Sequence, residues 1–386
     1  MGVRNRRWGS RWLHTSLGIM AVGALLGGSL QAAASSTVTL HMYTTGDTNV
    51  QSLWQNVLGP MFAKVHPGVK LDIAVKSSGT DAIVYGRLAA SVAAHKPSQF
   101  DIWDAGGITD QAEQAHLLSP FTLKNTPNMK MVEPALISQN LDTGMPYRGS
   151  AVVLAFNSLL VKHPPRTMAA LLKWIKANPG KFTYNTPPSG GSGDAFVQAI
   201  IMDNVPPAVR HKLTLTTPYN PKLEHDWAKG LGILKSLNPY IYRHGVYPNG
   251  NTAVLQLLSS DAIEMAPVWS DMFLSYIKKG LMPHTVHIVQ IKPPFYGGPA
   301  VLAIPKNSPH LALAHEFVNW VLQPSVQKII VSRMQGFPGI EWKYMPHSTL
   351  VRFASIAGAF ATPMSNQYDT DMAKVWQAQV AAAASK

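Results

Sequence analysis

The segment "TVTLHMYTTGDTNVQSLWQNVLGPMFAKVHPGVKLDIAV", residues 37–75, decides the fold class. Its first residues alternate between apolar and polar side chains, which is typical of a strand. Apolar residues then recur at helical spacing from Val50 to Phe62, and Pro67-Gly68 ends that pattern. A second alternating run follows over residues 69–75. A strand, a helix and a strand of these lengths predict two parallel strands joined by a crossover helix.

The alternation of strands and helices continues along the chain. Further strands are predicted at residues 100–107, 150–157, 181–187, 262–269, 284–293 and 297–307. Helices are predicted at residues 79–97, 167–180, 189–203, 221–237, 249–260 and 310–334, with two Ala-rich helical segments at 348–360 and 370–385. We find no repeat and no low-complexity linker. The pattern predicts an α/β protein of two interleaved lobes with mixed, mostly parallel sheets.

The first 34 residues are typical of a cleavable secretory signal peptide. Residues 1–16 carry four arginines and no acid, and residues 17–30 form an apolar run. Ala32 and Ala34 then stand in the register of a cleavage site. The run is shorter than the roughly 20 residues of a membrane span, although an uncleaved anchor is the alternative. The chain has no cysteine for lipid attachment, so we expect a protein released into the periplasm.

The composition excludes several classes of protein. The 386 residues are 46% hydrophobic and 14% charged, which is enough apolar material for two lobes and excludes a disordered chain. The formal net charge is +13, but Lys and Arg are scattered outside the signal peptide. We therefore expect a solvated basic surface, not a nucleic-acid site. Without cysteine, disulfides and thiolate chemistry are excluded.

Catalytic patterns are absent from the sequence. The 14 histidines form no H-E-x-x-H pattern, and "PPSGGSGD" lacks the spacing of a nucleophile elbow. No Gly-Lys-Ser/Thr follows a glycine loop, so there is no phosphate-binding P-loop. We expect no catalytic residue, no metal and no cofactor, and hence a binding protein. A secreted hydrolase or transferase on the same fold is the alternative, and a basic surface-binding structural protein is a third.

Candidate ligand residues follow from the places where strands end. In an open parallel sheet, ligands bind beyond the carboxyl ends of the strands. The aromatic, hydroxyl, glycine and acidic residues at those ends are Tyr43, Thr44, Ser78, Gly79, Thr80, Trp103, Asp104, Ser189, Gly190, Ser192, Asp194, Trp269 and Asp271. Each has a plainer alternative: Tyr43 and Trp103 fit a core, and Asp104 fits a turn or cap. The loops "SSGT" and "SGGSG" open helices and suit an anion, or they only make tight turns.

Three segments carry a resemblance to a known family: the opening strand–helix–strand, "ANPGKFTYNTPPSGGSGDAFVQAII" at 177–201, and "AIPKNSPHLALAHEFVNWVLQPSVQ" at 303–327. The chain resembles the periplasmic solute-binding proteins of ABC importers, in the two-lobed group that includes polyamine, thiamine and ferric-iron binders. The resemblance implies a hinge-linked periplasmic binding protein fold of type II. It assigns residues 35–148 and 297–386 to lobe 1, with a C-terminal helical cap, and residues 149–296 to lobe 2.

The resemblance also implies a mechanism. A monomer binds a small polar solute in the cleft between the lobes, closes on it, and docks on an ABC permease in the inner membrane. Tyr296, on a returning segment, joins the candidate site. Polyamine binders commonly read W-S-G-D where this chain reads Trp269-Ser270-Asp271. In an extended segment, a one-residue shift turns a side chain to the other face, so Trp269 carries over more safely than Asp271.

The ligand class stays open. Aromatic walls with Asp104 and Asp271 suit an organic cation, through stacking and ion pairing. The glycine loops suit a phosphate or another anion, and a ligand with both parts would satisfy both. A sugar would also use the aromatic faces. We favour a small polar organic solute, polyamine-like or thiamine-like, with a cationic amine slightly ahead. Iron is disfavoured because no Tyr-Tyr pair occurs.

Overall fold

The structure is a computed structural model, and it describes residues 37–44, 46–75, 81–105, 112–113, 115–214, 219–353, 356 and 360–384. All of them belong to one unit, residues 37–386. The predicted signal peptide and the candidate residues Ser78, Gly79 and Thr80 lie outside the described residues. Among the helices that are described, none is both long and apolar enough to cross a membrane.

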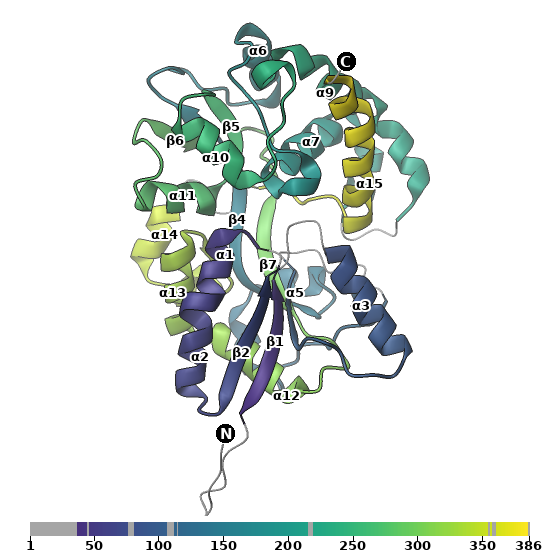
Figure 1. The fold of residues 1–386 in the computed structure, drawn as a ribbon, viewed down its shortest axis with the longest axis vertical. Helices are drawn as coiled ribbons and strands as arrows, with labels where there is room; N and C mark the ends of the chain where they lie inside the picture. Colours follow the sequence, from purple (N-terminus) through teal and green to yellow (C-terminus); the bar gives the residue numbers. More distant parts are fainter. Residues whose placement is uncertain are drawn as a thin grey trace, which may run out of the picture. The chain divides into compact units, whose positions relative to one another are not determined.

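A mixed sheet forms the centre of the fold (Figure 1). β1 (Val38–Thr44) pairs in parallel with β2 (Val69–Val75) and with β3 (Ile102–Asp104). This confirms the parallel strand–helix–strand expected at the start of the chain. The sheet continues in the order β2-β1-β3-β7-β4-β5, through β7 (Gly297–Ala303), β4 (Gly144–Asn157) and β5 (Met265–Trp269).

The rest of the sheet is antiparallel. β7 runs against β3 and β4, and β4 runs against β5, β6 (Val286–Val289) and β8 (Phe337–Pro338). The expectation of a mostly parallel sheet was therefore wrong for this part, although the mixed α/β class was right. The physical reason is that hydrophobic alternation identifies a strand but carries no information on its direction.

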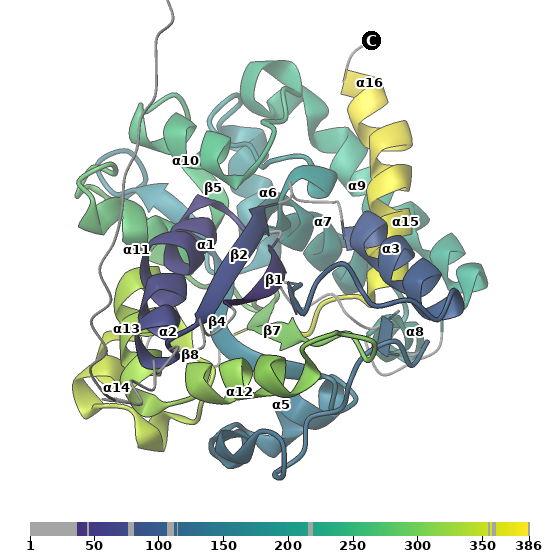
Figure 2. The ribbon, with the colours of Figure 1, turned by 60° about the horizontal axis from the view of Figure 1, so that its bottom comes forward.

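Helices surround the sheet (Figures 1 and 2). The α-helices are α1 (Thr48–Leu53), α2 (Gly59–Val65), α3 (Asp81–Ala93), α5 (Pro134–Gln139), α6 (Met168–Ala177), α7 (Gly191–Asn204), α8 (Pro207–Arg210), α9 (Ala228–Leu237), α10 (Asn251–Ser259), α11 (Ser270–Lys278), α12 (Leu311–Val321), α13 (Pro324–Met334), α14 (His347–Phe353), α15 (Asn366–Trp376) and α16 (Ala382–Ala384). A π-helical segment, Trp54–Leu58, joins α1 to α2, and another, Gln377–Ala381, joins α15 to α16. Short 3-10 helices lie at Pro127–Met131, Pro187–Ser189, His211–Leu213, Pro221–Trp227, Asn238–Tyr240, Tyr242–His244 and Trp342–Tyr344.

Two predicted elements differ from the structure because of proline. The single helix expected at 310–334 is two helices, α12 and α13, since Pro324 has no N–H to continue a helix and instead begins α13. The strand expected at 181–187 makes only isolated bridges, from Phe182 to Ile241 and Met265. Pro187 and Pro188 end this extended run in a 3-10 turn.

The C-terminal segment packs differently from the expected cap on lobe 1. Tyr368, Met372 and Trp376 of α15 belong to the same buried cluster as Tyr184 and Trp227 of the middle segment. The Trp376 indole also donates to the Tyr184 hydroxyl, at 3.2 Å. Figure 1 shows α15, in yellow, beside α7 and α9. The buried residues of α15 thus pack against residues from 149–296, whereas the expected cap belonged to the segment 297–386.

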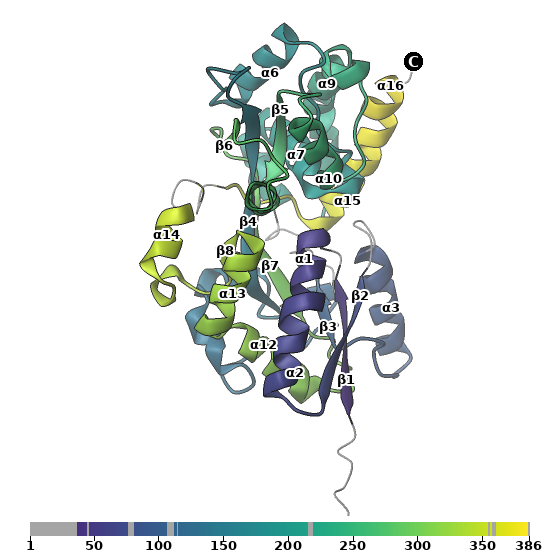
Figure 3. The same cartoon turned by 60° about the vertical axis from the view of Figure 1, so that its left-hand side comes forward.

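β4 lies between two buried cores. Ala151 and Val153 belong to one core cluster, whereas Val152 and Leu154 belong to another. Alternate residues of a strand point to opposite faces, so β4 separates the two clusters. In Figures 1 and 3, β4 and β7 run from the elements around β1 and β2 to those around α7 and α10. The middle of β4, residues 148–150, is where polar side chains gather.

Candidate functional site

The ends of β1 and β3 bring two predicted residues together. Thr44 and Asp104 are paired in the parallel register, and the Thr44 hydroxyl donates to Asp104 Oδ2 at 2.7 Å. The Trp54 indole donates to the same oxygen at 2.9 Å. Asp104 is only 1% exposed, and within the described part of the chain its Oδ1 has no hydrogen-bond partner. Two neutral donors thus hold Oδ2 of the carboxylate, and burial, together with the nearby Asp104, raises the pKa of the Tyr147 hydroxyl.

Tyr43 and Trp103 point away from these polar groups. The Tyr43 ring stacks on Phe100 with centroids 4.7 Å apart, and Trp103 meets Phe100 edge-on. Both belong to one buried cluster. Because neighbouring residues of a strand face opposite sides, Thr44 and Asp104 cannot share a face with Tyr43 and Trp103. The structure places these two aromatic residues in the core, which was the plainer alternative.

Arg148, in the middle of β4, was not among the predicted residues. Its Nε donates to the Tyr147 hydroxyl at 2.8 Å, and its side chain is partly exposed. Burial acts to lower the pKa of Arg148, but Tyr147, Asp104 and Asp271 outweigh it and raise the pKa above its ordinary value. The guanidinium is therefore always charged and lies in the field of two carboxylates.

The Asp271 side chain points toward the polar residues in the middle of β4. The chain turns into α11 at Ser270, so Asp271 lies in a first helical turn. Its Oδ1 accepts from the Ser150 hydroxyl at 2.6 Å, and its Oδ2 accepts from Asn49 Nδ2 at 3.1 Å. The argument that a missing glycine turns Asp271 away assumed an extended segment, and the helix removes that assumption.

Asn251, at the start of α10, links the N-terminal region to α7. Its Nδ2 donates to Asp47 Oδ2 at 2.8 Å, and its Oδ1 accepts from the Ser192 backbone N–H at 3.1 Å. Asn185 Oδ1 accepts from the Gly193 N–H at 2.8 Å. Burial raises the pKa of Asp47, and the Asn251 hydrogen bond opposes that rise.

The glycine loop at residues 189–193 was expected to suit an anion, but these contacts already use part of its backbone. The Ser192 and Gly193 amides at the start of α7 already have amide-oxygen partners. Ser189 bonds to Thr186 and accepts from the Gly250 N–H, and Gly190 packs against Asn251 where a Cβ would come within 2.6 Å. Ser189, Gly190 and Ser192 therefore build the loop, and these amides offer no open anion site.

Three other predicted residues, Asp194, Trp269 and Tyr296, form an aromatic corner together with Gly191, which was not predicted. The Tyr296 hydroxyl lies 2.7 Å from Asp194 Oδ2 and 2.9 Å from the Gly191 carbonyl. The Trp269 ring meets Tyr296 edge-on, with centroids 5.9 Å apart. Both rings are partly exposed. Burial, reinforced by nearby Asp369, raises the pKa of Asp194 well above its usual value.

The polar residues around Arg148 form one connected group, which we call the arginine cluster: Asp47, Asn49, Asp104, Arg148, Ser150, Asn251 and Asp271. The sequence predicted Asp104 and Asp271 but not the other five. One signal was available, because Arg148 and Ser150 interrupt a strand that is otherwise apolar. The cluster can bind donors through its carboxylates and acceptors through its guanidinium.

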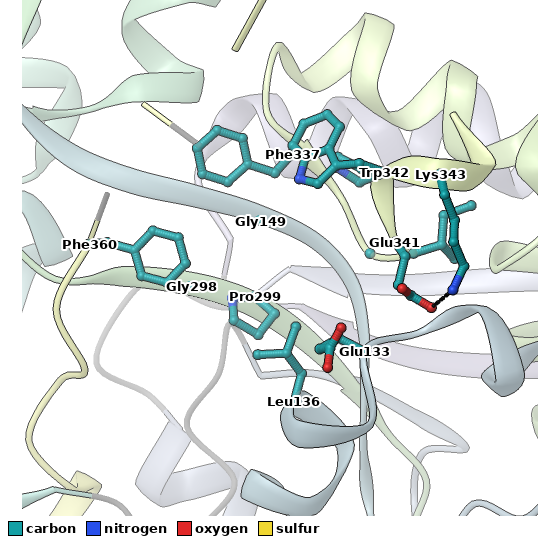
Figure 4. A pocket seen from close by; sticks show the side chains of 13 residues that line it. Glu133, Leu136, Gly149, Gly298, Pro299, Phe337, Glu341, Trp342, Lys343 and Phe360 are labelled. Atoms are coloured by element: carbon teal, nitrogen blue, oxygen red, sulfur yellow. Dashed lines mark ion pairs between the residues drawn. The ribbon is translucent and has the colours of Figure 1, made fainter. Parts of the chain in front are cut away.

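A separate apolar cavity of about 410 Å³ lies beside β4 and β8 (Figure 4). Its lining residues are Glu133, Leu136, Gly149, Gly298, Pro299, Phe337, Pro338, Gly339, Ile340, Glu341, Trp342, Lys343 and Phe360. Glu341 is already paired with Lys343 at 2.8 Å, as the dashed line in Figure 4 shows. None of the predicted residues that the structure describes lines this cavity. A polar solute finds more hydrogen-bonding partners in the arginine cluster.

Comparison with solved structures supports the fold. PotD of Streptococcus pneumoniae, a spermidine/putrescine ABC transporter substrate-binding protein, aligns with a TM-score of 0.65 at 13% identity, covering 90% of this chain and 99% of that chain. An ABC transporter solute-binding protein of Thermotoga lettingae, bound with alpha-D-tagatose, aligns with a TM-score of 0.65 at 17% identity, covering 88% and 93%. At these identities the likeness shows the fold alone.

Sequence comparison also identifies the family. Protein YnjB of Escherichia coli (strain K12) is 24% identical over 291 residues, which cover 73% of this chain and 74% of that protein. Residues 60–341 match the family described as bacterial extracellular solute-binding protein. That match spans well over half of the chain and includes most of the arginine cluster and the aromatic corner. The chain therefore belongs to the bacterial extracellular solute-binding protein family.

Proposed function

We propose that this protein is the solute-binding component of an ABC import system. It captures a small polar organic solute and delivers it to a permease in the inner membrane. Family membership and the shared fold support the binding role over catalysis. The predicted signal peptide and the lack of cysteine favour a protein released into the periplasm, where it works as a monomer.

We propose that the solute binds in a cleft between two lobes. The first lobe consists of residues 35–148 and 297–353, and the second of residues 149–296 together with the C-terminal helix α15. The observation that carries this proposal is that hydrogen bonds within the arginine cluster join residues of the two proposed lobes. Asp47 and Asn49, from the first lobe, bond to Asn251 and Asp271, from the second. A solute must contact both lobes to favour a closed state, and this cluster offers both.

A thermal-shift panel tests the binding role. The panel contains polyamines, thiamine phosphates, aminophosphonates, amino acids, sugars and oxyanions. A solute present at 100 times its dissociation constant stabilises the folded protein by about 2.7 kcal/mol, so binding is expected to raise the melting temperature clearly. If no compound in the panel raises it, the import role is contradicted.

Trp269→Ala tests where the solute binds, and Trp342→Ala is a matched control. Both side chains are partly buried tryptophans, but Trp342 lines the apolar cavity. We expect Trp269→Ala to abolish the solute-induced shift while moving the unliganded melting temperature by only a few degrees. Trp342→Ala is expected to keep the shift. The reverse pattern would move the solute site to the apolar cavity, and an equal loss of unliganded stability would make Trp269 a core residue.

A further inference from the structure

Arg148 is a cation placed among three carboxylates, yet it pairs directly with none of them. Asp271 accepts from Ser150, two residues from Arg148 on β4, and Asp104 accepts from Trp54, whose ring lies 5.2 Å from that of Tyr147. In agreement with this placement, Asp104 and Asp271 raise the pKa of Arg148, and Arg148 opposes the rise in the pKa of Asp47. Within the described residues, however, no carboxylate oxygen lies within 4.0 Å of a guanidinium nitrogen. Arg148 instead contacts Tyr147: its Nε donates to the hydroxyl at 2.8 Å, and its guanidinium carbon lies over the ring, 5.3 Å from the centroid. Its terminal nitrogens face no acid at contact distance.

The acids are held apart from Arg148 by neutral donors. Asp104 accepts from Thr44 and Trp54, while Asp271 accepts from Ser150 and Asn49. A guanidinium fork and a carboxylate normally form short bidentate contacts, which are among the strongest hydrogen bonds in proteins. Here neutral donors occupy three of the four carboxylate oxygens of Asp104 and Asp271, and the fork of Arg148 makes no ion pair with either acid among the described residues. An anionic group from outside the protein fits that fork.

The cluster also contains acceptors that lack donors. Asp104 Oδ1 and Asn49 Oδ1 are buried and have no hydrogen-bond partner in the described part of the chain. A buried acceptor without a donor carries a desolvation cost, and such atoms are uncommon in native proteins. An N–H or O–H group of a bound solute would satisfy them. Three acids against one arginine also leave a negative balance, which favours an ammonium as that donor.

We infer that the solute is zwitterionic, with an anionic oxyacid group bound by the fork of Arg148 and an amine that donates to Asp104 and Asn49. This inference rests on the proposed solute-binding function and names its substrate class. A polyamine supplies the amine but leaves Arg148 without a partner and adds a positive charge beside it. A neutral sugar satisfies the acceptors but forgoes the charge-assisted contact with the guanidinium.

Matched probe sets test the inference on the unmodified protein. Each set holds an amino acid, the acid without its amine and the amine without its acid: β-alanine, propanoate and propylamine; 4-aminobutyrate, butanoate and butylamine; 5-aminopentanoate, pentanoate and pentylamine. Aminoalkyl phosphonates of the same lengths separate a carboxylate from a phosphonate. Putrescine, spermidine and a neutral hexose complete the panel, and thermal shift and calorimetry give the affinities.

We expect at least one zwitterion to bind at least about tenfold more tightly than both of its halves, because each half leaves one charged partner unsatisfied. If a polyamine or the hexose binds and no zwitterion does, this inference is overturned while the import role stands. If none of the probes binds, this inference is overturned, and the wider thermal-shift panel then decides the import role.

Variants at position 148 test the role of the guanidinium. Arg148→Gln is expected to weaken binding of the best zwitterion by about tenfold or more, and Arg148→Lys to restore part of it, because lysine keeps the charge without the fork. Arg333→Gln, an exposed position in the last turn of α13, is the control for the same change in net charge. Unchanged zwitterion affinity in folded Arg148→Gln, compared with Arg333→Gln, would overturn the inference. The Arg148→Lys variant and the probe sets keep the test open if the Gln variant folds poorly.

Discussion

Asp194 and Asp369 form a pair of carboxyl groups at the junction of α7 and α15. Gln198 Nε2 donates to one oxygen of each, at 2.9 Å in both cases, and Tyr296 donates to Asp194. Burial raises the pKa of both groups, and the proximity of Asp369 raises that of Asp194 further. Two carboxylates this close cannot both be charged at low cost, so the folded protein retains a proton that the unfolded chain releases.

The acid pair makes stability depend on pH. A folded-state pKa above the unfolded value of 3.8 means that the contribution is complete below pH 3.8 and is lost as pH rises through the folded pKa. We therefore expect the contribution of this pair, measured with urea as the free energy of unfolding of the wild type minus that of Asp194→Asn, to fall as pH rises from 5 to 8. Asp194→Asn removes the shared proton and is expected to flatten this dependence, and Asp369→Asn should do the same. If the free energy of unfolding changed with pH in both variants as it does in the wild type, the pairing would be contradicted.

His315 produces the opposite dependence. It is 4% exposed, and burial lowers its pKa to about 4. Its Nε2 is hydrogen-bonded to the Ser119 hydroxyl at 3.0 Å, and its Nδ1 lies 3.3 Å from the Thr126 hydroxyl, so both ring nitrogens have neutral partners. The unfolded chain takes up the proton near pH 6.5, so stability is expected to fall by up to about 3 kcal/mol between pH 6.5 and 4. His315→Gln should remove this loss. Urea unfolding at pH 7 and pH 4.5 measures it, and the prediction is contradicted if the free energy of unfolding drops as much in the variant as in the wild type.

The residues of the candidate site were predictable where they lie at strand ends. Thr44 and Asp104 end β1 and β3, and the ends-of-strands rule finds both, although it does not predict that these two strands are neighbours. Arg148 lies in the middle of β4, where that rule does not look. The Asn251–Asp47 hydrogen bond joins residues that are 204 positions apart, and no local sequence pattern predicts such a contact.

α7 depends on glycine at one position for a packing reason. A Cβ at Gly193 would lie 1.8 Å from the backbone carbonyl oxygen of Asn185, and a backbone atom cannot move aside cheaply. Gly232, on the exposed face of α9, has no atom within 4 Å of its Cβ position. Two helical glycines of this chain therefore face opposite surroundings.

Alanine substitutions at these glycines should change stability in opposite directions. Gly193→Ala is expected to destabilise the protein by about 3 kcal/mol or more, because α7 has to move away from Asn185. Gly232→Ala is expected to stabilise it by about 0.5–1 kcal/mol, since alanine is the better helix former. Urea unfolding of both variants measures the two effects. If both substitutions changed the free energy of unfolding in the same direction, the contact with Asn185 would not determine the effect at Gly193.

At the scale of elements, periodicity predicted most strands and helices but neither their direction nor their partners. The run from Val38 to Val75 folds as expected because each segment has one clear period. β4 begins at Gly144, six residues before the predicted strand, because Pro146 and Arg148 break the apolar pattern. The Ala-rich segment at 370–385 was predicted as a helix of a C-terminal cap, but its sequence does not show which of the two cores α15 packs against.

For the whole molecule, two hydrogen bonds of the arginine cluster that join the proposed lobes have the largest consequence. Ser275 and Lys278 also bond between the proposed lobes, to the Met334 and Ser332 carbonyls at the edge of α13. The Asn251–Asp47 and Asn49–Asp271 contacts join segments that are 204 and 222 residues apart. If the lobes open to admit solute, both contacts break in the open form and stabilise only the closed form. They therefore bias the equilibrium that the solute must shift.

Removing both contacts should favour the open form and weaken binding. A net hydrogen bond contributes about 0.5–1.5 kcal/mol, so Asn49→Ala with Asn251→Ala should raise the dissociation constant of the best panel solute by about 5- to 100-fold. Small-angle scattering should show a larger radius of gyration for the double variant at equal, subsaturating solute. Asn56→Ala, which loses only a local bond to Ser52, is the control and should behave as the wild type. An unchanged dissociation constant and radius in the double variant would mean that these contacts do not open during binding, and that the cluster is a fixed part of the fold.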